Sequence, residues 1–357
     1  MLKNDIKKDN FKTSSKLLKE VRLTHSSDET AVTEVERRGQ QSSLLKDDHH
    51  ADNCDVRQIH GSKKISGNAY LSRWMRISLR AQDKSSVFQN LLTHINVESL
   101  TEAFNALDGS KALGVDGVSK KAYQKNLQTN LEDLVGRIKR GVYRPRPKRE
   151  VLIPKSNGKV RPIAIACFED KLIDWVLGKI LTEIYEPCFI KTSFGFRENH
   201  SCHQAIEASY YNLKDDKRSN VVEIDFSNFF NTIPHKKLME IVNKKIKDVK
   251  FRAIIRRCLQ SETIHADGVK RRGTRGTPQG GIMSPILANL YLNEVVDQWF
   301  KANYNKHNCK IVRYADDAVF FFKNEDEAKE FLPAFKKRRE NPVRLLKLYF
   351  LLGKTWE

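Results

Sequence analysis

Two short apolar runs in the last fifth of the chain are rich in β-prone residues and flank a pair of carboxylates. Residues 311–313 and 318–322 enclose the tetrapeptide Tyr-Ala-Asp-Asp at 314–317. Apolar runs on both sides of a short polar break predict a β-hairpin with Asp316 and Asp317 at its tight turn. Because side chains alternate along a regular strand, the turn is what allows both carboxylates to face one site.

A further strand and a second hairpin are predicted upstream. Residues 221–224 form an apolar run that ends at Asp225. Residues 151–154 and 160–165 are the arms of the second hairpin, and the Asn-Gly pair between them is a strong turn signal. Apolar residues at helical spacing predict helices over residues 97–107, 123–139, 168–186, 251–259 and 284–299, and one that begins near Pro234.

Asp225, Asp316 and Asp317 are candidate ligands of two Mg²⁺ ions. Two such ions roughly 4 Å apart need bridging carboxylates, so that one activates the attacking oxygen of a phosphoryl transfer and the other stabilises the leaving oxygen. Three acids at strand ends supply that set. An Asp-Asp pair alone is more often a solvated turn, since Asp supports turns through its own backbone. The apolar strands on both sides of the pair favour the site.

The charge balance indicates the kind of partner. The 357 residues include 64 Lys and Arg against 44 Asp and Glu, a formal net charge of +20. Such a basic chain favours a polyanion, with nucleic acid first and an anionic membrane second. No strongly amphipathic basic helix supports the membrane, and no apolar run approaches the roughly 20 residues of a membrane span. We therefore expect no membrane partner.

The length suffices for one large or two ordinary domains. Residues 1–65 are polar and nearly free of aromatic side chains, which predicts a disordered or weakly structured tail. The N-terminus shows no apolar segment of the kind found in signal peptides. The six cysteines are scattered and form no C-x-x-C pair. This pattern fits reduced thiols, so a cytoplasmic location is expected.

Three basic residues lie on or beside the turn of the predicted hairpin 150–165: Lys155, Lys159 and Arg161. A basic hairpin tip can clamp a triphosphate and neutralise charge during attack at its α-phosphate. The alternative is a turn whose charges serve only solubility. Arg161 favours the functional interpretation, because an Arg inside an apolar strand is costly unless it has an anion as partner.

A Gly-rich loop at residues 276–285 leads into the helix predicted from 284, with Ser284 as its N-cap and Pro285 as its first residue. Glycines let a backbone approach a ligand closely. Gln279 in this loop offers both a donor and an acceptor to a base or a sugar. Taken alone, the loop is equally compatible with an ordinary turn before a helix.

Phe230 lies five residues after Asp225, where a bulky aromatic ring can press on the 2′ position of an incoming nucleotide's sugar. Phe229 is its neighbour. A purely structural role in the core remains an alternative for either ring, and we expect one of the two to have it.

Together these segments resemble the reverse transcriptases encoded by bacterial group II introns, also called intron maturases. Several motifs in order are more specific than any one of them. The matching stretches follow the family order over about residues 70–330, at 111–118, 153–163, 193–197, 225–234, 277–292 and 314–317. Retron, diversity-generating and CRISPR-associated reverse transcriptases share the palm, but the 111–118 loop and the spacing around Phe194 favour the intron type.

The resemblance implies an α+β right-hand polymerase fold, with residues 66–220 as N-terminal extension and fingers and 221–335 as palm. It implies synthesis of DNA from deoxynucleoside triphosphates on an RNA template such as the intron RNA, with a DNA primer or target. Two Mg²⁺ ions would be held by Asp225, Asp316 and Asp317. The residues that it assigns to nucleotide binding are Lys155, Arg161, Phe230 and Gln279. The residues that it assigns to template and primer are Phe194, Arg197 and Lys159.

The family pattern is lost after about Arg339. We expect the thumb and the maturase domain to be missing and residues 336–357 to form an aberrant tail, as a frameshift or a truncation would produce. Two alternatives to an active enzyme therefore stay open. One is a catalytically inactive, maturase-like RNA-binding protein, and the other is a decayed reading frame. The sequence gives no indication of oligomeric state.

Overall fold

The structure, a computed structural model, describes residues 72–154, 158, 160–214, 218–226, 228–304, 309–337 and 350–351. The chain divides into two units, Met1–Ser72 and Arg73–Glu357, and every element below belongs to the second. The predicted N-terminal tail lies outside the described residues. So do Lys155 and Lys159.

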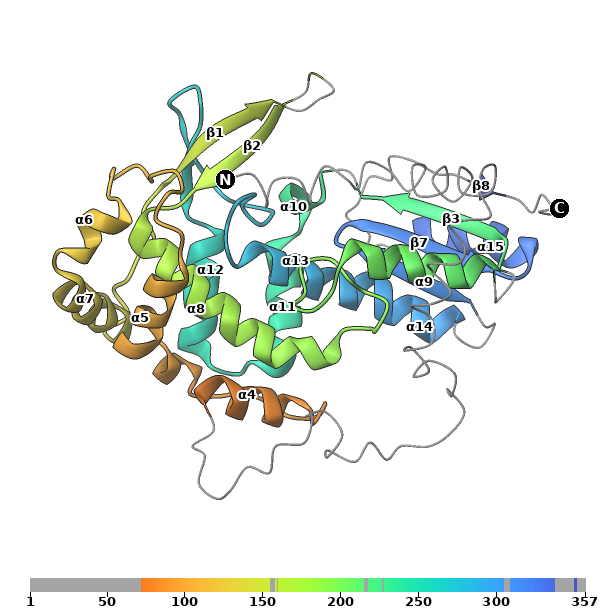
Figure 1. The fold of residues 1–357 in the computed structure, drawn as a ribbon, viewed down its shortest axis with the longest axis horizontal. Helices are drawn as coiled ribbons and strands as arrows, with labels where there is room; N and C mark the ends of the chain where they lie inside the picture. The colour runs from red at the N-terminus through yellow and green to blue at the C-terminus, as the bar shows by residue number, and fades with distance from the viewer. Residues whose placement is uncertain are drawn as a thin grey trace, which may run out of the picture. The chain divides into compact units, whose positions relative to one another are not determined.

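A long apolar helix, α8 (Phe168–Tyr185), is the centre of the N-terminal half of this unit (Figure 1). Most of its residues are buried, as expected of a helix that is apolar nearly all round. It contacts α4 (Arg73–Ala81), α5 (Val97–Ala106) and α13 (Ser284–Leu292). The helix predicted over 123–139 is instead two helices that pack beside α5, namely α6 (Lys120–Gln124) and α7 (Leu127–Lys139).

The predicted hairpin at 150–165 is confirmed as β1 (Lys148–Pro154) and β2 (Val160–Ile165), which pair antiparallel from Arg149↔Ile165 to Pro154↔Val160. It belongs to a four-stranded sheet of order β2-β1-β4-β5. The short hairpin β4 (Glu262–Ile264) and β5 (Lys270–Arg272) was not predicted, and β4 lies parallel to β1.

The second sheet has the order β6-β7-β3-β8. The hairpin around the Asp pair is confirmed, with β6 (Lys310–Tyr314) and β7 (Asp317–Phe322) joined by two residues. The predicted strand β3 (Asn220–Asp225) pairs antiparallel with β7, so Asp225 lies opposite Asp317. Strand β8 (Phe350–Leu351) pairs with β3 from within the segment expected as an aberrant tail, most of which is outside the described residues.

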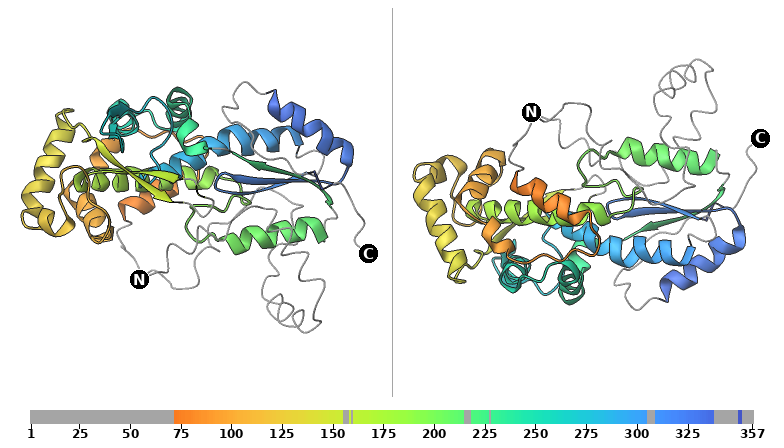
Figure 2. Two further views of the ribbon diagram at one scale, coloured as in Figure 1. Left: turned by 90° about the horizontal axis from the view of Figure 1, so that it is seen from above. Right: turned by 90° about the horizontal axis from the view of Figure 1, so that it is seen from below.

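Helices cover both faces of this second sheet. Helix α9 (Cys202–Lys214) lies on one face, and α14 (Gln298–Tyr304) and α15 (Glu325–Lys336) lie on the other (Figure 2). The strands therefore bury alternate side chains on opposite faces. Phe321 belongs to the cluster on the α9 side, whereas Phe320 packs against Phe331 of α15 with ring centroids 4.6 Å apart.

The remaining helices lie before β1 or between β2 and β4 in the chain. They are η1 (Leu91–His94), η2 (Glu186–Cys188), α10 (Phe229–Thr232), α11 (His235–Lys245) and α12 (Val249–Leu259). The helix predicted over 284–299 continues further, because α13 passes through a π turn, η3 (Asn293–Asp297), into α14. Its N-cap is Met283 and not Ser284, whose hydroxyl donates to the carbonyl of Pro278 at 2.7 Å.

Helix α4 corrects one expectation, because it is both basic and amphipathic. Ile77 and Ala81 are buried while Arg76 and Arg80 are exposed. Its apolar side is covered by protein: Trp74 of α4 meets Trp175 of α8 edge to face at 6.5 Å. Among the described helices, none has the length and apolar character needed to cross a membrane.

Two buried carboxyl groups lie one turn apart on α8. The hydroxyl of Tyr143 donates to Asp170 Oδ1 at 2.6 Å, and the backbone N–H of Arg146 donates to its Oδ2 at 3.0 Å. The positive charge of Lys148 favours the ionised form of Asp174. The Nζ of Lys148 donates to the carbonyl of Cys258 at 2.9 Å. Burial nevertheless raises the pKa of both carboxyl groups to about 6.

We expect Asp174→Asn to weaken the dependence of stability on pH. A carboxyl whose pKa is raised in the folded state binds more protons there than in the unfolded chain, so the free energy of unfolding falls as pH rises from about 4 to about 6. Asparagine has no such dependence, so the variant should gain stability relative to wild type across this window. Urea unfolding at several pH values measures the difference. Asp326→Asn, at an exposed residue of α15, is the control, and parallel curves for wild type and Asp174→Asn would contradict the prediction.

Candidate active site

A two-residue turn, Ala315-Asp316, joins β6 to β7 and places Asp316 at the tip of the hairpin. Ala315 has φ 57°, a left-handed conformation that is uncommon for residues other than glycine. A positive φ at the first turn position is typical of the mirror-image turns whose twist suits a hairpin. Ala315 is also buried, so its strained backbone is held by surrounding structure.

The three predicted carboxylates meet at the end of β3 beside this turn. Asp225 is the residue opposite Asp317 in the sheet, and Asp316 precedes Asp317. Burial first, and then the negative charges of Asp316, Asp225 and Glu223, raise the pKa of Asp317 to about 8. The pKa of Asp316 is also raised, first by burial and then by Asp225. Each carboxylate therefore destabilises the ionised form of its neighbour.

Such a cluster suits a divalent cation. Carboxylate oxygens are the hard ligands that Mg²⁺ prefers, and a cation would relieve the repulsion that raises these pKa values. Within the described part of the chain, no three His, Cys, Asp or Glu side chains are already closed around a common metal position. The donor set of three carboxylates fits the ion.

The backbone of Gly195 packs directly on the Ala315-Asp316 turn. A Cβ at Gly195 would lie 2.2 Å from the Ala315 nitrogen and 2.9 Å from its Cα, so only glycine fits here. Backbone hydrogen bonds fix the approach: the N–H of Phe194 donates to the carbonyl of Arg313 at 2.8 Å, and the N–H of Arg313 donates to Thr192 at 2.9 Å.

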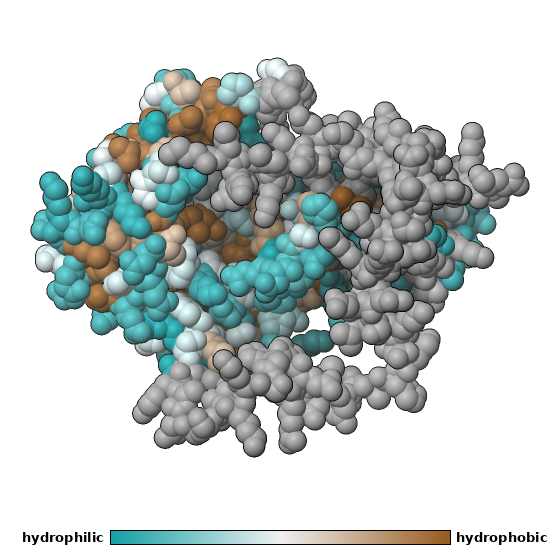
Figure 3. Space-filling view, viewed as in Figure 1, coloured by the Kyte–Doolittle hydropathy of each residue, from teal (hydrophilic) through white to brown (hydrophobic). Residues whose placement is uncertain are grey.

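The predicted triphosphate contact at Arg161 is exposed, and its positive charge offsets part of the rise in the pKa of Asp316. It therefore lies within electrostatic reach of the carboxylates. The premise that Arg161 is enclosed in an apolar strand is wrong, because the hairpin that carries it is largely exposed. Figure 3 shows hydrophobic side chains gathered over this hairpin, where Leu152, Ile153 and Val160 are each 44–54% exposed. Exposed apolar side chains gathered in this way are typical of a binding surface.

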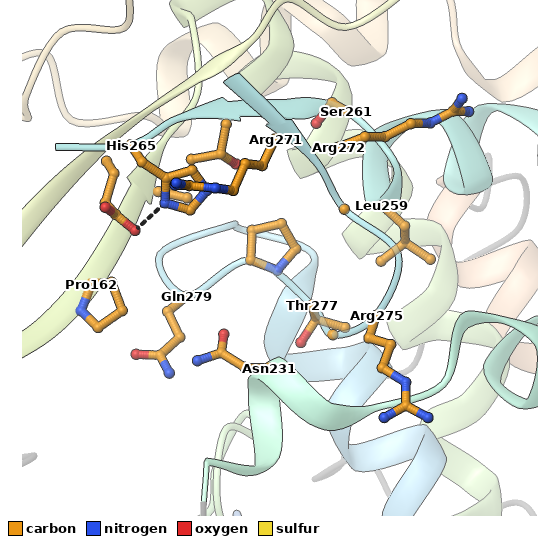
Figure 4. Close-up of a pocket in the computed structure, with 16 residues that line it drawn as sticks. Pro162, Asn231, Leu259, Ser261, His265, Arg271, Arg272, Arg275, Thr277 and Gln279 are labelled. Carbon is orange, nitrogen blue, oxygen red and sulfur yellow. Dashed lines mark hydrogen bonds and ion pairs between the residues drawn. The ribbon is translucent and has the colours of Figure 1, made fainter. Parts of the chain in front are cut away.

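A pocket of about 270 Å³ lies between β2, the β4–β5 hairpin and the Gly-rich loop (Figure 4). The loop carrying Gln279 is fixed to the fingers hairpin, because the N–H of Ala164 donates to the carbonyl of Gln279 at 2.8 Å. At the top of the pocket, the His265 ring contacts Glu150 at 3.0 Å. The lining of the pocket includes Pro162, Asn231, Arg271, Arg275, Thr277 and Gln279.

The two adjacent phenylalanines after β3 have different environments. Phe229 is 1% exposed and belongs to the core, so the structural role falls to this ring. Phe230 is only partly buried and meets Phe196 edge to face at 6.1 Å. The carbonyl of Phe230 accepts a hydrogen bond from the N–H of Thr277 at 2.6 Å, which joins it to the Gly-rich loop. Phe230 thus remains a candidate for contact with a nucleotide.

Residues 153–345 match the model of one protein family, described as reverse transcriptase (RNA-dependent DNA polymerase). That match spans more than half of the chain and includes all three carboxylates. The chain belongs to the reverse transcriptase family. The α+β fold expected from the sequence is confirmed for this member of the family.

Curated relatives extend the comparison. Over 231 residues the chain is 36% identical to Protein YkfC of Escherichia coli (strain K12), covering 63% of this chain and 60% of the relative. Over 228 residues it is 34% identical to the Group II intron-encoded protein LtrA of Lactococcus lactis subsp. cremoris, covering 62% and 37%. The chain therefore spans less than two thirds of these relatives. The resemblance to group II intron reverse transcriptases is confirmed.

Solved structures also align with this chain. A telomerase from Candida albicans in complex with a fragment of telomeric RNA covers 67% of this chain and 49% of its own, at 11% identity and a TM-score of 0.47.

Two residues assigned to template and primer are engaged within the protein. Phe194 is buried in the cluster between α9 and the sheet. The guanidinium of Arg197 pairs with Glu186 at 2.6 Å and lies over the ring of Phe189. Both side chains therefore help to hold the loop that packs on the Ala315-Asp316 turn. Contact with template and primer stays a prediction for them and for Lys159.

Arg313 was missed by the sequence analysis. It lies in the apolar strand β6 and is fully buried beside Asp297. An Arg inside an apolar strand needs an anionic partner, as was expected for Arg161. Residues 311–313 also belong to an apolar run, so the same reasoning identifies Arg313. Here the anion is a carboxylate of the protein.

Proposed function

We propose that this chain catalyses RNA-templated DNA synthesis. In this reaction the 3′-hydroxyl of a primer attacks the α-phosphate of a deoxynucleoside triphosphate, and pyrophosphate leaves. The observation that carries the proposal is the meeting of Asp225, Asp316 and Asp317 at the end of one sheet, in a chain that belongs to the reverse transcriptase family. Two Mg²⁺ ions, an RNA template and a DNA primer are its proposed cofactors and partners.

The residues of the site would have the following roles in this reaction. The three carboxylates would hold the metal ions, which when bound activate the primer hydroxyl and stabilise the leaving oxygen. Arg161, exposed and within electrostatic reach of Asp316, would neutralise charge on the triphosphate. Gln279 would line the nucleotide pocket from a loop whose backbone is fixed to β2.

Primer extension tests the proposal. The full chain is given a DNA primer annealed to an RNA template, Mg²⁺ and deoxynucleoside triphosphates, and Asp316→Asn is measured beside it with Asp326→Asn as control. We expect extension by the wild type and the control, and a loss of at least about 100-fold in Asp316→Asn, the scale seen when one preorganised polar group is removed from a site. No extension by the wild type would overturn the proposal.

Replacing Phe230 by Val should weaken discrimination against ribonucleotides. The partly buried ring lies beside the carboxylate strand and its edge contact with Phe196 limits its movement. A smaller side chain leaves room for a 2′-hydroxyl, so the ratio of kcat/KM for deoxy- over ribonucleotides should fall about 10- to 100-fold. Single-nucleotide incorporation measures the ratio. Tyr211→Leu, at an exposed aromatic residue of α9, is the control, and an unchanged ratio in Phe230→Val would contradict the assignment.

A second function, binding of a structured intron RNA, is favoured by the net charge of +20 and by the similarity to a group II intron-encoded protein. Such binding depends on phosphate and shape contacts and not on the carboxylates. We therefore propose that Asp316→Asn keeps it. Filter binding of a folded group II intron RNA to wild type and variant, over a range of salt concentrations, tests this second function.

A further inference from the structure

The guanidinium of Arg313 is fully buried three residues before Asp316, and the carboxylate of Asp297 beside it is buried to the same degree. The two groups form a fork: Nε donates to Oδ1 at 2.9 Å and Nη2 donates to Oδ2 at 2.6 Å. Asp297 is the last residue of the π turn η3. Single π turns inside α-helices are frequently found at functional sites.

The remaining donor group of Arg313 points back to the catalytic turn. Nη1 donates to the carbonyl of Ala315 at 2.8 Å and to Oδ1 of Asn289 at 2.9 Å. The side-chain amide of Asn289 in turn donates to the carbonyl of Gly195 at 2.8 Å. Gly195 is the residue whose backbone lies against Ala315. One buried network thus holds a carbonyl of the turn and a carbonyl of the loop packed on it.

Stability does not explain such a network by itself. Taking two charges out of water is costly, and replacing a buried ion pair by apolar residues of similar volume is often neutral or stabilising. Ile311 and Val312 show that the same strand otherwise buries apolar side chains. What the network provides is a fixed orientation of the Ala315 carbonyl, and so of the peptide that leads into Asp316 in a strained left-handed turn.

We propose that Arg313, together with Asp297 and Asn289, positions the Ala315-Asp316 turn so that the carboxylate of Asp316 is held ready for a divalent cation. These three are positioning residues, since none of them reaches the reacting atoms. Removing a residue that hydrogen-bonds to a metal ligand and orients it commonly lowers metal affinity about 10- to 100-fold. The inference rests on the proposed function for its catalytic consequence, but its consequence for cation binding is independent of catalysis.

The test compares two pairs of substitutions. Arg313→Met with Asp297→Leu removes the buried fork without leaving a charge unpaired. Arg137→Met with Glu169→Leu removes another charge pair, at 2.8 Å between α7 and α8, and is the matched control. Arg313→Lys keeps the charge but loses the fork. Each protein is measured for thermal unfolding without metal, for Mn²⁺ affinity by electron paramagnetic resonance without nucleic acid, and for kcat in primer extension.

We expect the Arg313/Asp297 double variant to melt within a few degrees of wild type and to bind Mn²⁺ about 10- to 100-fold more weakly, with kcat lowered to a similar extent. Arg313→Lys should not restore the affinity, and the control pair should match wild type. A folded double variant with wild-type Mn²⁺ affinity and kcat would overturn the inference. So would a wild type that binds no Mn²⁺.

Two further outcomes are decided by the same measurements. If the wild type extends no primer but the double variant still loses Mn²⁺ affinity, the proposed function fails and the positioning role stands. If the double variant does not fold, Asn289→Ala decides the question, because it removes the link to Gly195 and leaves the Arg313–Asp297 pair intact. Weaker Mn²⁺ binding by Asn289→Ala supports the inference, and unchanged binding overturns it.

Discussion

Asp317→Asn is expected to stabilise the metal-free protein while abolishing DNA synthesis. The pKa of Asp317 is raised to about 8 by burial and by two neighbouring carboxylates. Because the folded chain holds this proton more tightly than the unfolded chain, the free energy of unfolding of the wild type falls as pH rises from about 4 to about 8. Asparagine avoids that loss, so the variant's advantage should grow across this window and reach on the order of a few kcal/mol above pH 8.

Urea unfolding in the presence of a chelator, at pH 6 and pH 9, measures this advantage, with Asp326→Asn as the control at an exposed position. Addition of Mg²⁺ should then stabilise the wild type, because a ligand that binds only the folded state shifts the equilibrium towards it. The variant should gain much less. Equal stability of wild type and Asp317→Asn at pH 9 without metal would show that the carboxylates are not crowded as described.

Gly195→Ala is expected to have the second largest effect. The added Cβ would meet the backbone of Ala315 at 2.2 Å, and a backbone contact cannot be relieved by a side-chain rotation. The catalytic turn or the loop must move, which should cost about 1–3 kcal/mol of stability, as overpacking does. A displacement of about 1 Å at a catalytic group can cost about 100-fold in rate, so kcat should fall by at least that factor.

Thermal unfolding and primer extension on an RNA template measure both consequences. Gly178→Ala in α8 is the matched control, since its Cβ would come no closer than 3.7 Å to any neighbour and alanine favours a helix. Normal extension by Gly195→Ala would mean that the close approach of this loop is not needed for catalysis.

The sequence predicted those parts of the fold whose residues form apolar runs or have apolar residues at helical spacing. The hairpins at 150–165 and 311–322 were predicted because their arms are apolar and their turns are short. The strand ending at Asp225 was predicted because it is an apolar run. The β4–β5 hairpin was missed for the opposite reason. Lys270–Arg272 is exposed along its whole length, so no alternation of apolar residues marks it. The π turn at Asn293–Asp297 has no sequence signal of its own.

For the site, the sequence located the carboxylates but not what holds them in place. Asp225, Asp316 and Asp317 follow apolar strands, so their meeting at one sheet end could be inferred from strand pairing. The contacts of Arg313 and Gly195 with the turn depend on loops and helices that lie far apart in the sequence. Phe194 shows the same limit, because only the packing of α9 reveals that its ring is buried.

We propose that the clustered carboxylates hold metal ions that would act on the α-phosphate of the incoming nucleotide during copying of RNA. The most direct test is extension on an RNA template with nucleotides that carry sulfur on the α-phosphate, in Mg²⁺ and in Mn²⁺. Sulfur is a poor ligand for the hard Mg²⁺ ion and a better one for a softer metal. We expect that one sulfur isomer is used poorly with Mg²⁺ and is rescued by Mn²⁺ in the wild type but not in Asp317→Asn. The same sulfur effect with both metals would contradict it.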